Sequence, residues 1–111
     1  IESEDDIKNV KPDFDKLINL DGQGLIISSK SEQFDFVSRY FCPKYGINED
    51  PVTGSAHTTL IPYWADKLNK SSMTAKQISN RGGILYCTNL DERVLIGGKA
   101  VLYMKGVIEI T

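Results

Sequence analysis

The stretch that decides the fold is "GSAHTTLIPYWADKLNK", residues 54–70. Apolar side chains recur in it every four positions, at Ala56, Leu60, Trp64 and Leu68. This spacing places them on one face of a helix. Ile61 and Ala65 lie beside that row and widen the apolar stripe, so we predict a helix that is well buried. A buried helix needs other elements packed around it, and the flanking sequence supplies them.

Short segments rich in β-branched and aromatic residues flank this helix on both sides. They cover residues 25–29 and 34–41 before it, and 73–79, 83–89, 93–98 and 100–110 after it. The later segments are separated by short turns, which favours antiparallel neighbours. Two short helices are predicted near the N-terminus, one capped by Ser3 and one with Pro12 at its first position. The sequence therefore predicts an α+β domain, in which a mixed or antiparallel sheet wraps around the central helix.

Length and composition narrow the class of protein. A chain of 111 residues fits one domain, and 41% hydrophobic with 25% charged residues is ordinary for a globular protein. Acidic and basic residues are interspersed and the net charge is -2. This argues against nucleic acid or an anionic membrane as the main partner. No apolar run is long enough to span a bilayer, and no signal peptide is visible.

The chain ends and the cysteines carry two further expectations. "IESEDDI" (1–7) reads as the exit from a strand into a helix, so we expect this chain to be a piece of a longer protein. Cys42 and Cys87 have no metal-binding or redox spacing. Reduced thiols are favoured over a disulfide, which predicts a cytoplasmic location.

The segment "EDPVTGSAH" (49–57) leads into the central helix and has two interpretations. The first turn of a helix leaves backbone N–H groups unpaired and carries a partial positive charge. With Thr53 as N-cap, Thr53, Gly54, Ser55 and Ala56 form a candidate cradle for a carboxylate. Asp50, just upstream, could shuttle a proton or orient an amine. The alternative is that the same residues are only turn and N-cap chemistry.

Several other polar residues are candidates for supporting roles. Glu49 is more typical of a solvated loop acid, although Glu49 or Asp50 could pair with Arg39 on the aromatic strand. His57 falls in the first helical turn, where a packing or hydrogen-bonding role is favoured over catalysis. It has no companion ligand at metal-binding spacing, so no metal site is predicted.

"QISNRGG" (77–83) forms a second polar cluster with two open interpretations. It is either a hairpin with a polar face or the mouth of a pocket. In the second case Gln77 and Ser79 bound the pocket and Arg81 supplies positive charge.

Long parts of the sequence resemble one known family. The segments are "KPDFDKLINLDGQGLIISS", "FDFVSRYFCPKYGINEDPVTGSAHTTLIPYWADKLNK", "AKQISNRGG" and "VLIGGKAVLYMKGVI". They are similar to the second half of the PhzF-like (phenazine biosynthesis-like) isomerases, over essentially all 111 residues. The resemblance implies half of a diaminopimelate epimerase-like fold, whose active site lies in the cleft between two similar halves. Residues 1–111 are then a single domain, with the N-terminal half absent.

The resemblance also implies a chemistry. The family moves protons without a cofactor, and its characterised reaction isomerises a dihydro-hydroxyanthranilate with a glutamate from the first half. Asp50 and Ser55 correspond to its substrate-positioning residues, and the backbone of Thr53–Ser55 to its carboxylate site. Related racemases have a cysteine where this chain has Asp50. Cys42 lies eight residues away, so two-thiol chemistry is not supported.

The implied partners are a small carboxylate-bearing metabolite, the missing N-terminal half and, since the family tends to dimerise, a second copy. The fragment alone is expected to be inactive, because the catalytic glutamate belongs to the missing half. Two alternatives stay open. One is a non-catalytic domain that binds a carboxylate metabolite or a protein partner, and the other is a structural half-barrel with a capped helix.

Overall fold

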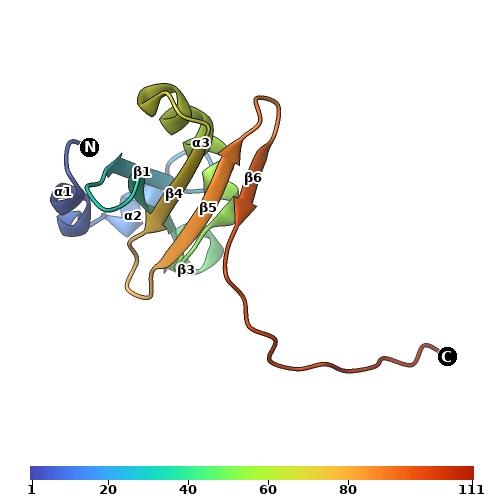
Figure 1. Cartoon of the computed structure of the whole chain (residues 1–111). Coiled ribbons are helices and arrows are strands. Elements are labelled where there is room, and N and C mark those ends of the chain that lie inside the picture. Colours follow the sequence, from blue (N-terminus) through green and yellow to red (C-terminus); the bar gives the residue numbers. More distant parts are fainter.

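The computed structural model describes residues 1–111 and shows a six-stranded sheet with one long helix and short helical turns (Figure 1). The elements are α1 (Glu4–Asn9), α2 (Phe14–Ile18), β1 (Leu25–Lys30), β2 (Phe36–Cys42), the 3-10 helix η1 (Pro43–Tyr45), β3 (Ile47–Glu49), α3 (Gly54–Leu68), β4 (Ser72–Gln77), β5 (Gly83–Asn89) and β6 (Val94–Gly97). The predicted central helix and five of the six predicted strands are confirmed.

The strands run in the order β1-β2-β4-β5-β6, and β3 pairs with β2 away from this path. The contact between β2 and β4 is parallel, and all other pairs are antiparallel. A parallel pair needs a crossover connection, and α3 supplies it. The sheet is therefore mixed, as predicted. Because β2 has neighbours on both edges and is buried along most of its length, it can carry apolar side chains on both faces.

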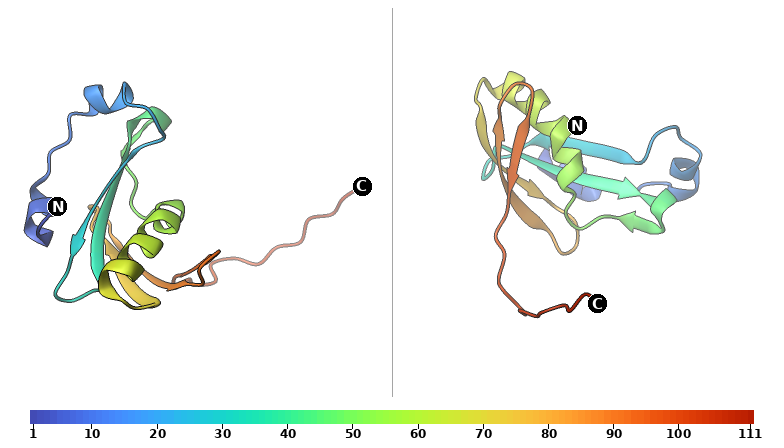
Figure 2. Two further views of the ribbon diagram at one scale, coloured as in Figure 1. Left: turned by 90° about the horizontal axis from the view of Figure 1, so that it is seen from above. Right: turned by 90° about the vertical axis from the view of Figure 1, so that its right-hand side faces the viewer.

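The main core lies between α3 and one face of the sheet, which curves around the helix (Figure 2). Leu60, Ile61 and Trp64 of the predicted apolar stripe are buried there. Phe36 of β2 is fully buried between two rings of α3. Its ring centroid lies 5.5 Å from that of Trp64 and 6.0 Å from that of His57. The stripe of the sequence therefore becomes the contact surface that fixes α3 on the sheet.

The N-terminal segment covers the other face of β1 and β2 (Figure 2). Ile7 of α1 is fully buried, and Phe14 packs edge-on against Phe41, with ring centroids 6.2 Å apart. Arg39 of β2 fixes the N-terminal segment on the sheet, because it donates to the Ile7 and Val10 carbonyl oxygens at 2.9 and 3.0 Å. The two helical layers thus sandwich the β1–β2 part of the sheet.

Two local predictions were wrong. Pro12 does not start the second helix, because the Asp13 side chain accepts a hydrogen bond from the Lys16 N–H at 3.2 Å and makes Asp13 the N-cap. The segment 42–52, left without a helix or strand in the sequence prediction, contains β3. This strand pairs with the end of β2 across a register shift at Phe41 and Cys42. Tertiary pairing stabilises three residues with little strand signal of their own.

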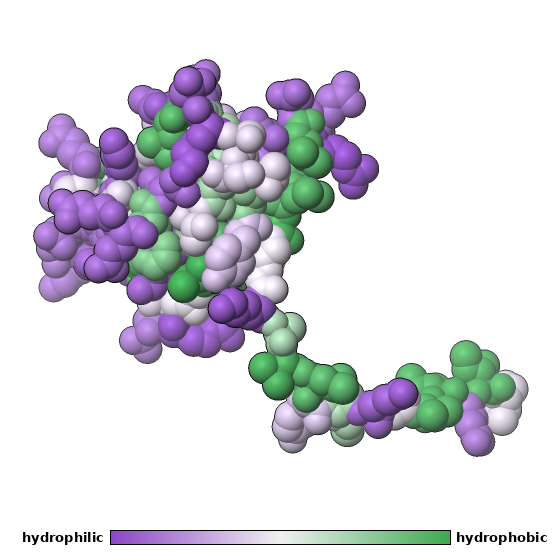
Figure 3. Space-filling model, viewed as in Figure 1, coloured by the Kyte–Doolittle hydropathy of each residue, from purple (hydrophilic) through white to green (hydrophobic).

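The predicted strand 100–110 is also wrong. Residues after β6 extend away from the domain as an unpaired tail (Figure 1). Hydrophobic side chains follow this tail in Figure 3, and Tyr103 is 98% exposed. An alternating apolar pattern forms a strand only where a neighbour supplies hydrogen bonds and covers its apolar face. No strand of this chain pairs with the tail.

We expect removal of the tail to leave the domain's stability unchanged. Residues 99–111 make no hydrogen bond to the rest of the chain, so ending the chain after Gly98 should change the free energy of unfolding by less than about 0.5 kcal/mol. Self-association should weaken, because an exposed apolar surface is lost. Urea denaturation and sedimentation of the 98- and 111-residue chains measure both effects. A loss of more than about 2 kcal/mol would show that the tail packs against the domain.

Candidate functional site

The candidate site lies where β3 leads through residues 50–53 into the N-terminus of α3. The Asp50 N–H donates to the Tyr40 carbonyl oxygen at 3.0 Å, which ties the start of this loop to β2. Val52 presses against the backbone of Gly83, so closely that a Cβ at position 83 would overlap its side chain. The loop is therefore held between β2 and the start of β5.

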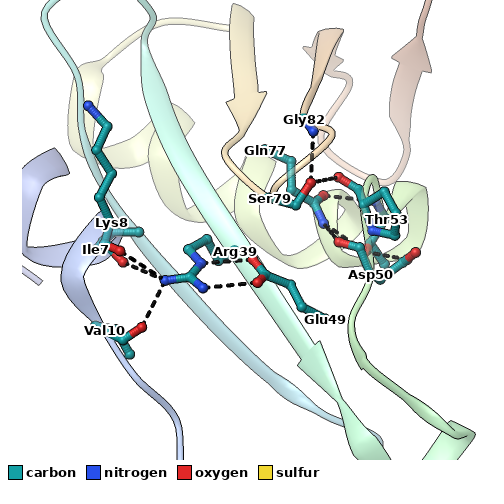
Figure 4. Close-up of polar contacts among 11 residues, drawn as sticks. Ile7, Lys8, Val10, Arg39, Glu49, Asp50, Thr53, Gln77, Ser79 and Gly82 are labelled. Carbon is teal, nitrogen blue, oxygen red and sulfur yellow. Dashed lines mark hydrogen bonds and ion pairs between the residues drawn. The ribbon is translucent and has the colours of Figure 1, made fainter.

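A hydrogen-bonded cluster joins Asp50, Thr53 and Gln77 (Figure 4). The Thr53 hydroxyl donates to Asp50 Oδ2 at 2.6 Å. Gln77 Oε1 accepts from the Thr53 N–H at 2.8 Å. Gln77 Nε2 contacts the Asp50 carbonyl oxygen at 2.9 Å and Thr53 Oγ1 at 3.0 Å. One amide at the end of β4 thus holds both ends of the Asp50–Thr53 turn.

Ser79 secures the same loop from the β4–β5 turn. Its hydroxyl donates to the Pro51 carbonyl oxygen at 2.7 Å and accepts from the Gly82 N–H at 2.9 Å. Gln77 is only 1% exposed. Neither Gln77 nor Ser79 lines the open groove that adjoins this loop. Both side chains hold the loop by hydrogen bonds. Gln77 faces the core with Met73 and Ala75 because side chains alternate along β4.

The N-terminus of α3 is accessible. Gly54 and Ser55 are exposed, and the N–H groups of Gly54, Ser55 and Ala56 donate to no residue upstream of the helix. Thr53 occupies the predicted N-cap position, but its side chain makes no cap hydrogen bond and its N–H is taken by Gln77. Of the predicted cradle, residues 53–56, the candidate carboxylate site therefore keeps residues 54–56 and loses Thr53.

An open groove of about 710 Å³ adjoins this helix end. Val52 and Gly54 form part of its wall, and the charged residues that line it are all basic: Lys76, Arg81 and Lys99. Arg81 lines the same groove as Gly54, the first residue of the helix. Arg81 and the positive helix end favour an anionic ligand, whereas the Lys76 ammonium lies over the Phe34 ring, 5.6 Å from its centroid. Lys76 and Lys99 carry no sequence signal for this site: Lys76 belongs to β4, and Lys99 follows β6 at the start of the unpaired tail.

His57 is a buried packing residue, which is the role the sequence favoured. It is 0% exposed, stacks on Phe36, and its Nδ1 lies 2.8 Å from the Thr53 carbonyl oxygen. That oxygen can only accept, so Nδ1 carries the proton. Burial lowers the pKa of His57 below its ordinary value of 6.5, and the bond to Thr53 opposes this only in part. His57 is thus a neutral side chain that supports the N-cap residue Thr53 through packing and one hydrogen bond.

This burial predicts a pH dependence of stability. Below pH 6.5 the unfolded chain binds a proton at His57 that the folded chain resists. The free energy of unfolding should therefore fall as the pH drops from 6.5 toward the lower folded-state pKa, by at most about 1.4 kcal/mol per pH unit. Urea denaturation of the wild type and of His57→Gln at a series of pH values measures this slope. Equal slopes in both proteins would contradict the assignment.

Glu49 lies apart from the site. Its carboxylate pairs with Arg39, with Nε–Oε1 at 2.8 Å and Nη2–Oε2 at 2.9 Å, on the side of the sheet that faces α1. This hydrogen-bonded pair raises the pKa of Arg39. Of the two candidate partners for Arg39, the structure selects Glu49 and not Asp50. Successive residues of a strand point to opposite faces, so Glu49 and Asp50 separate.

Tyr40 and Cys42 are neighbours of Asp50 that the sequence did not single out for the site. Desolvation raises the pKa of both side chains, and the negative charge of Asp50 adds to the effect. The signal that could have found them is the pairing of β2 with β3, which was not predicted. Cys42 and Cys87 are free, buried thiols. Burial raises the pKa of Cys87 to about 11, so both stay protonated and neither has the character of a nucleophile.

No group of three or more His, Cys, Asp or Glu side chains converges in a way that could hold a metal ion. None of the helices has the length and apolar character needed to cross a bilayer.

Comparison with known proteins identifies the class of this domain. The family described as "Phenazine biosynthesis-like protein" matches residues 1–106. The chain therefore belongs to the phenazine biosynthesis-like (PhzC–PhzF) family, as the sequence resemblance predicted. A crystal structure of a putative phenazine biosynthesis PhzC/PhzF protein from Clostridium difficile superposes with a TM-score of 0.87 and 51% identity. It covers 99% of this chain, which confirms the diaminopimelate epimerase-like fold class.

Relatives occur in bacteria and animals. An uncharacterized isomerase from Pseudomonas aeruginosa is 51% identical over 111 residues, and a phenazine biosynthesis-like domain-containing protein from Homo sapiens is 41% identical over 113. The chain spans 42% of the length of the first, 39% of the second and 43% of the Clostridium difficile chain.

Proposed function

We propose that this chain is the second half of an isomerase that moves a proton on a small carboxylate-bearing metabolite without a cofactor. The observation that carries the proposal is the juxtaposition of the Asp50 carboxylate with an accessible helix N-terminus, beside a groove whose charged residues are all basic. Membership of a family with members named isomerases supports the reaction class.

The proposal assigns separate roles in binding, proton transfer and loop support to these residues. Free N–H groups of residues 54–56 and the Ser55 hydroxyl bind the substrate carboxylate, helped by the helix dipole and by Arg81. Asp50 lies four to six residues upstream and takes or returns a proton, or orients a substrate amine. Gln77, Ser79 and His57 hold the loop that presents these groups.

The proposal includes a partner half. Relatives are more than twice as long as this chain, and a second acid/base group, a glutamate in the family pattern, is expected from the part not spanned here. The tail 99–111 exposes the apolar surface that such a half, or a second copy of the chain, could cover. The isolated chain is then expected to bind an anion but not to turn it over.

Proton exchange in heavy water tests this function. The full-length protein should incorporate deuterium into a dihydro-hydroxyanthranilate or into one member of a panel of small carboxylates, and the 111-residue chain should not. Mass spectrometry of the recovered metabolite measures incorporation. Absence of exchange across the panel, with a carboxylate still bound by the full-length protein in calorimetry, would favour the non-catalytic binding domain instead.

A further inference from the structure

Hydrogen-bond donors and acceptors in the Gln77 cluster can be assigned without ambiguity. A backbone N–H only donates and a backbone carbonyl only accepts. The Gln77 atom 2.8 Å from the Thr53 N–H must therefore be Oε1, and the atom 2.9 Å from the Asp50 carbonyl oxygen must be Nε2. The reversed amide would place two donors together and two acceptors together. The orientation of this buried side chain is fixed by its partners.

This orientation sets the direction of the next hydrogen bond. The second Nε2 proton of Gln77 points to Thr53 Oγ1 at 3.0 Å, so that oxygen accepts. Its own hydroxyl proton is then free to donate, and the partner within reach is Asp50 Oδ2 at 2.6 Å. The chain of donors runs from the Gln77 amide through the Thr53 hydroxyl to the Asp50 carboxylate.

The consequence is an asymmetric carboxylate. Asp50 Oδ2 is occupied as an acceptor, whereas Oδ1 accepts no hydrogen bond within the chain. Gln77 and Thr53 are both buried, so water cannot easily replace either contact. A proton that Asp50 gains from a substrate is then carried on Oδ1 while Oδ2 keeps its bond to Thr53.

We propose that Gln77 and Thr53 are positioning residues that orient the Asp50 carboxylate, with Oδ2 as a permanent acceptor and Oδ1 as the oxygen presented to substrate. The inference rests on the proposed function for its catalytic meaning, but its geometry can be tested independently. Neither residue touches the substrate in this scheme. Both act through Asp50.

The test compares three variants of the full-length protein with two control variants. Thr53→Val removes the hydroxyl with little change of shape, and Thr53→Ser retains it. Gln77→Glu keeps the acceptor for the Thr53 N–H but loses both donors. Controls are Thr59→Val and Gln33→Glu, the same exchanges at exposed positions. Crystal structures report the Asp50 carboxylate, and deuterium incorporation into a dihydro-hydroxyanthranilate reports turnover.

We expect Thr53→Val and Gln77→Glu to show the Asp50 carboxylate rotated or in two conformers. Their kcat should fall by about 10- to 100-fold, with KM within about threefold. Thr53→Ser and both controls should match the wild type. An Asp50 carboxylate that superposes on the wild type in Thr53→Val overturns the inference, and so does a Thr53→Ser defect as large as that of Thr53→Val. If Gln77→Glu does not fold, the two Thr53 variants decide.

Failure of the proposed function has a different signature. A wild-type protein that catalyses no exchange refutes that function for this substrate. The crystallographic comparison of Thr53→Val with Thr53→Ser still decides whether the hydrogen bonds from Gln77 through Thr53 orient the Asp50 carboxylate.

Discussion

Replacing Asp50 by asparagine in the full-length protein is expected to lower kcat by about 10²- to 10⁴-fold, the usual contribution of a positioned acid or base. Asparagine has nearly the same shape, and its amide oxygen can still accept from the Thr53 hydroxyl that now bonds Oδ2 at 2.6 Å. It cannot accept a proton at neutral pH. The fold should therefore survive while proton transfer fails.

Deuterium incorporation into substrate in heavy water measures the loss, and circular dichroism with thermal unfolding checks the fold. Asp66→Asn, an exposed change on α3, is the matched control and should leave both unchanged. Wild-type exchange rates in Asp50→Asn would remove Asp50 from the chemistry. The carboxylate would then be no more than part of the N-cap loop.

The largest effect on stability is expected from Phe36→Ala, at about 3–5 kcal/mol. Phe36 is 0% exposed, and its ring is held between those of Trp64 and His57. Alanine would leave a cavity between α3 and β2 that neither rigid ring can fill. The loss combines burial with the stacking contacts. The same cavity would loosen His57 and, through it, the Thr53 carbonyl at the helix start.

Urea denaturation of the 111-residue chain measures this change, with Tyr103→Ala as control. Tyr103 also loses an aromatic ring, but it is 98% exposed in the tail, so its replacement should change stability by less than about 0.5 kcal/mol. A loss below about 1 kcal/mol in Phe36→Ala would show that the core contact between helix and sheet is not the main source of stability.

The sequence by itself determined the central helix, because the recurrence of Ala56, Leu60 and Trp64 is a local property of one continuous segment. It also determined the helix start, since "DPVTGS" combines turn and N-cap chemistry within a few residues. Strands rich in β-branched and aromatic residues, such as β2 and β5, were also predicted correctly. In each case the signal lies within one continuous segment.

Only the tertiary structure decided which of the polar residues meet. In the fold, Gln77 hydrogen-bonds to the Asp50–Thr53 turn, and Glu49 pairs with Arg39 on the opposite face of the sheet. The tertiary structure also left residues 100–110 unpaired although their composition is typical of a strand. The Gln77 contacts, the Glu49–Arg39 pair and the unpaired tail have the same physical reason. A hydrogen bond between distant residues, or between a strand and its neighbour, depends on what the fold brings alongside, and a local pattern carries no information about that partner.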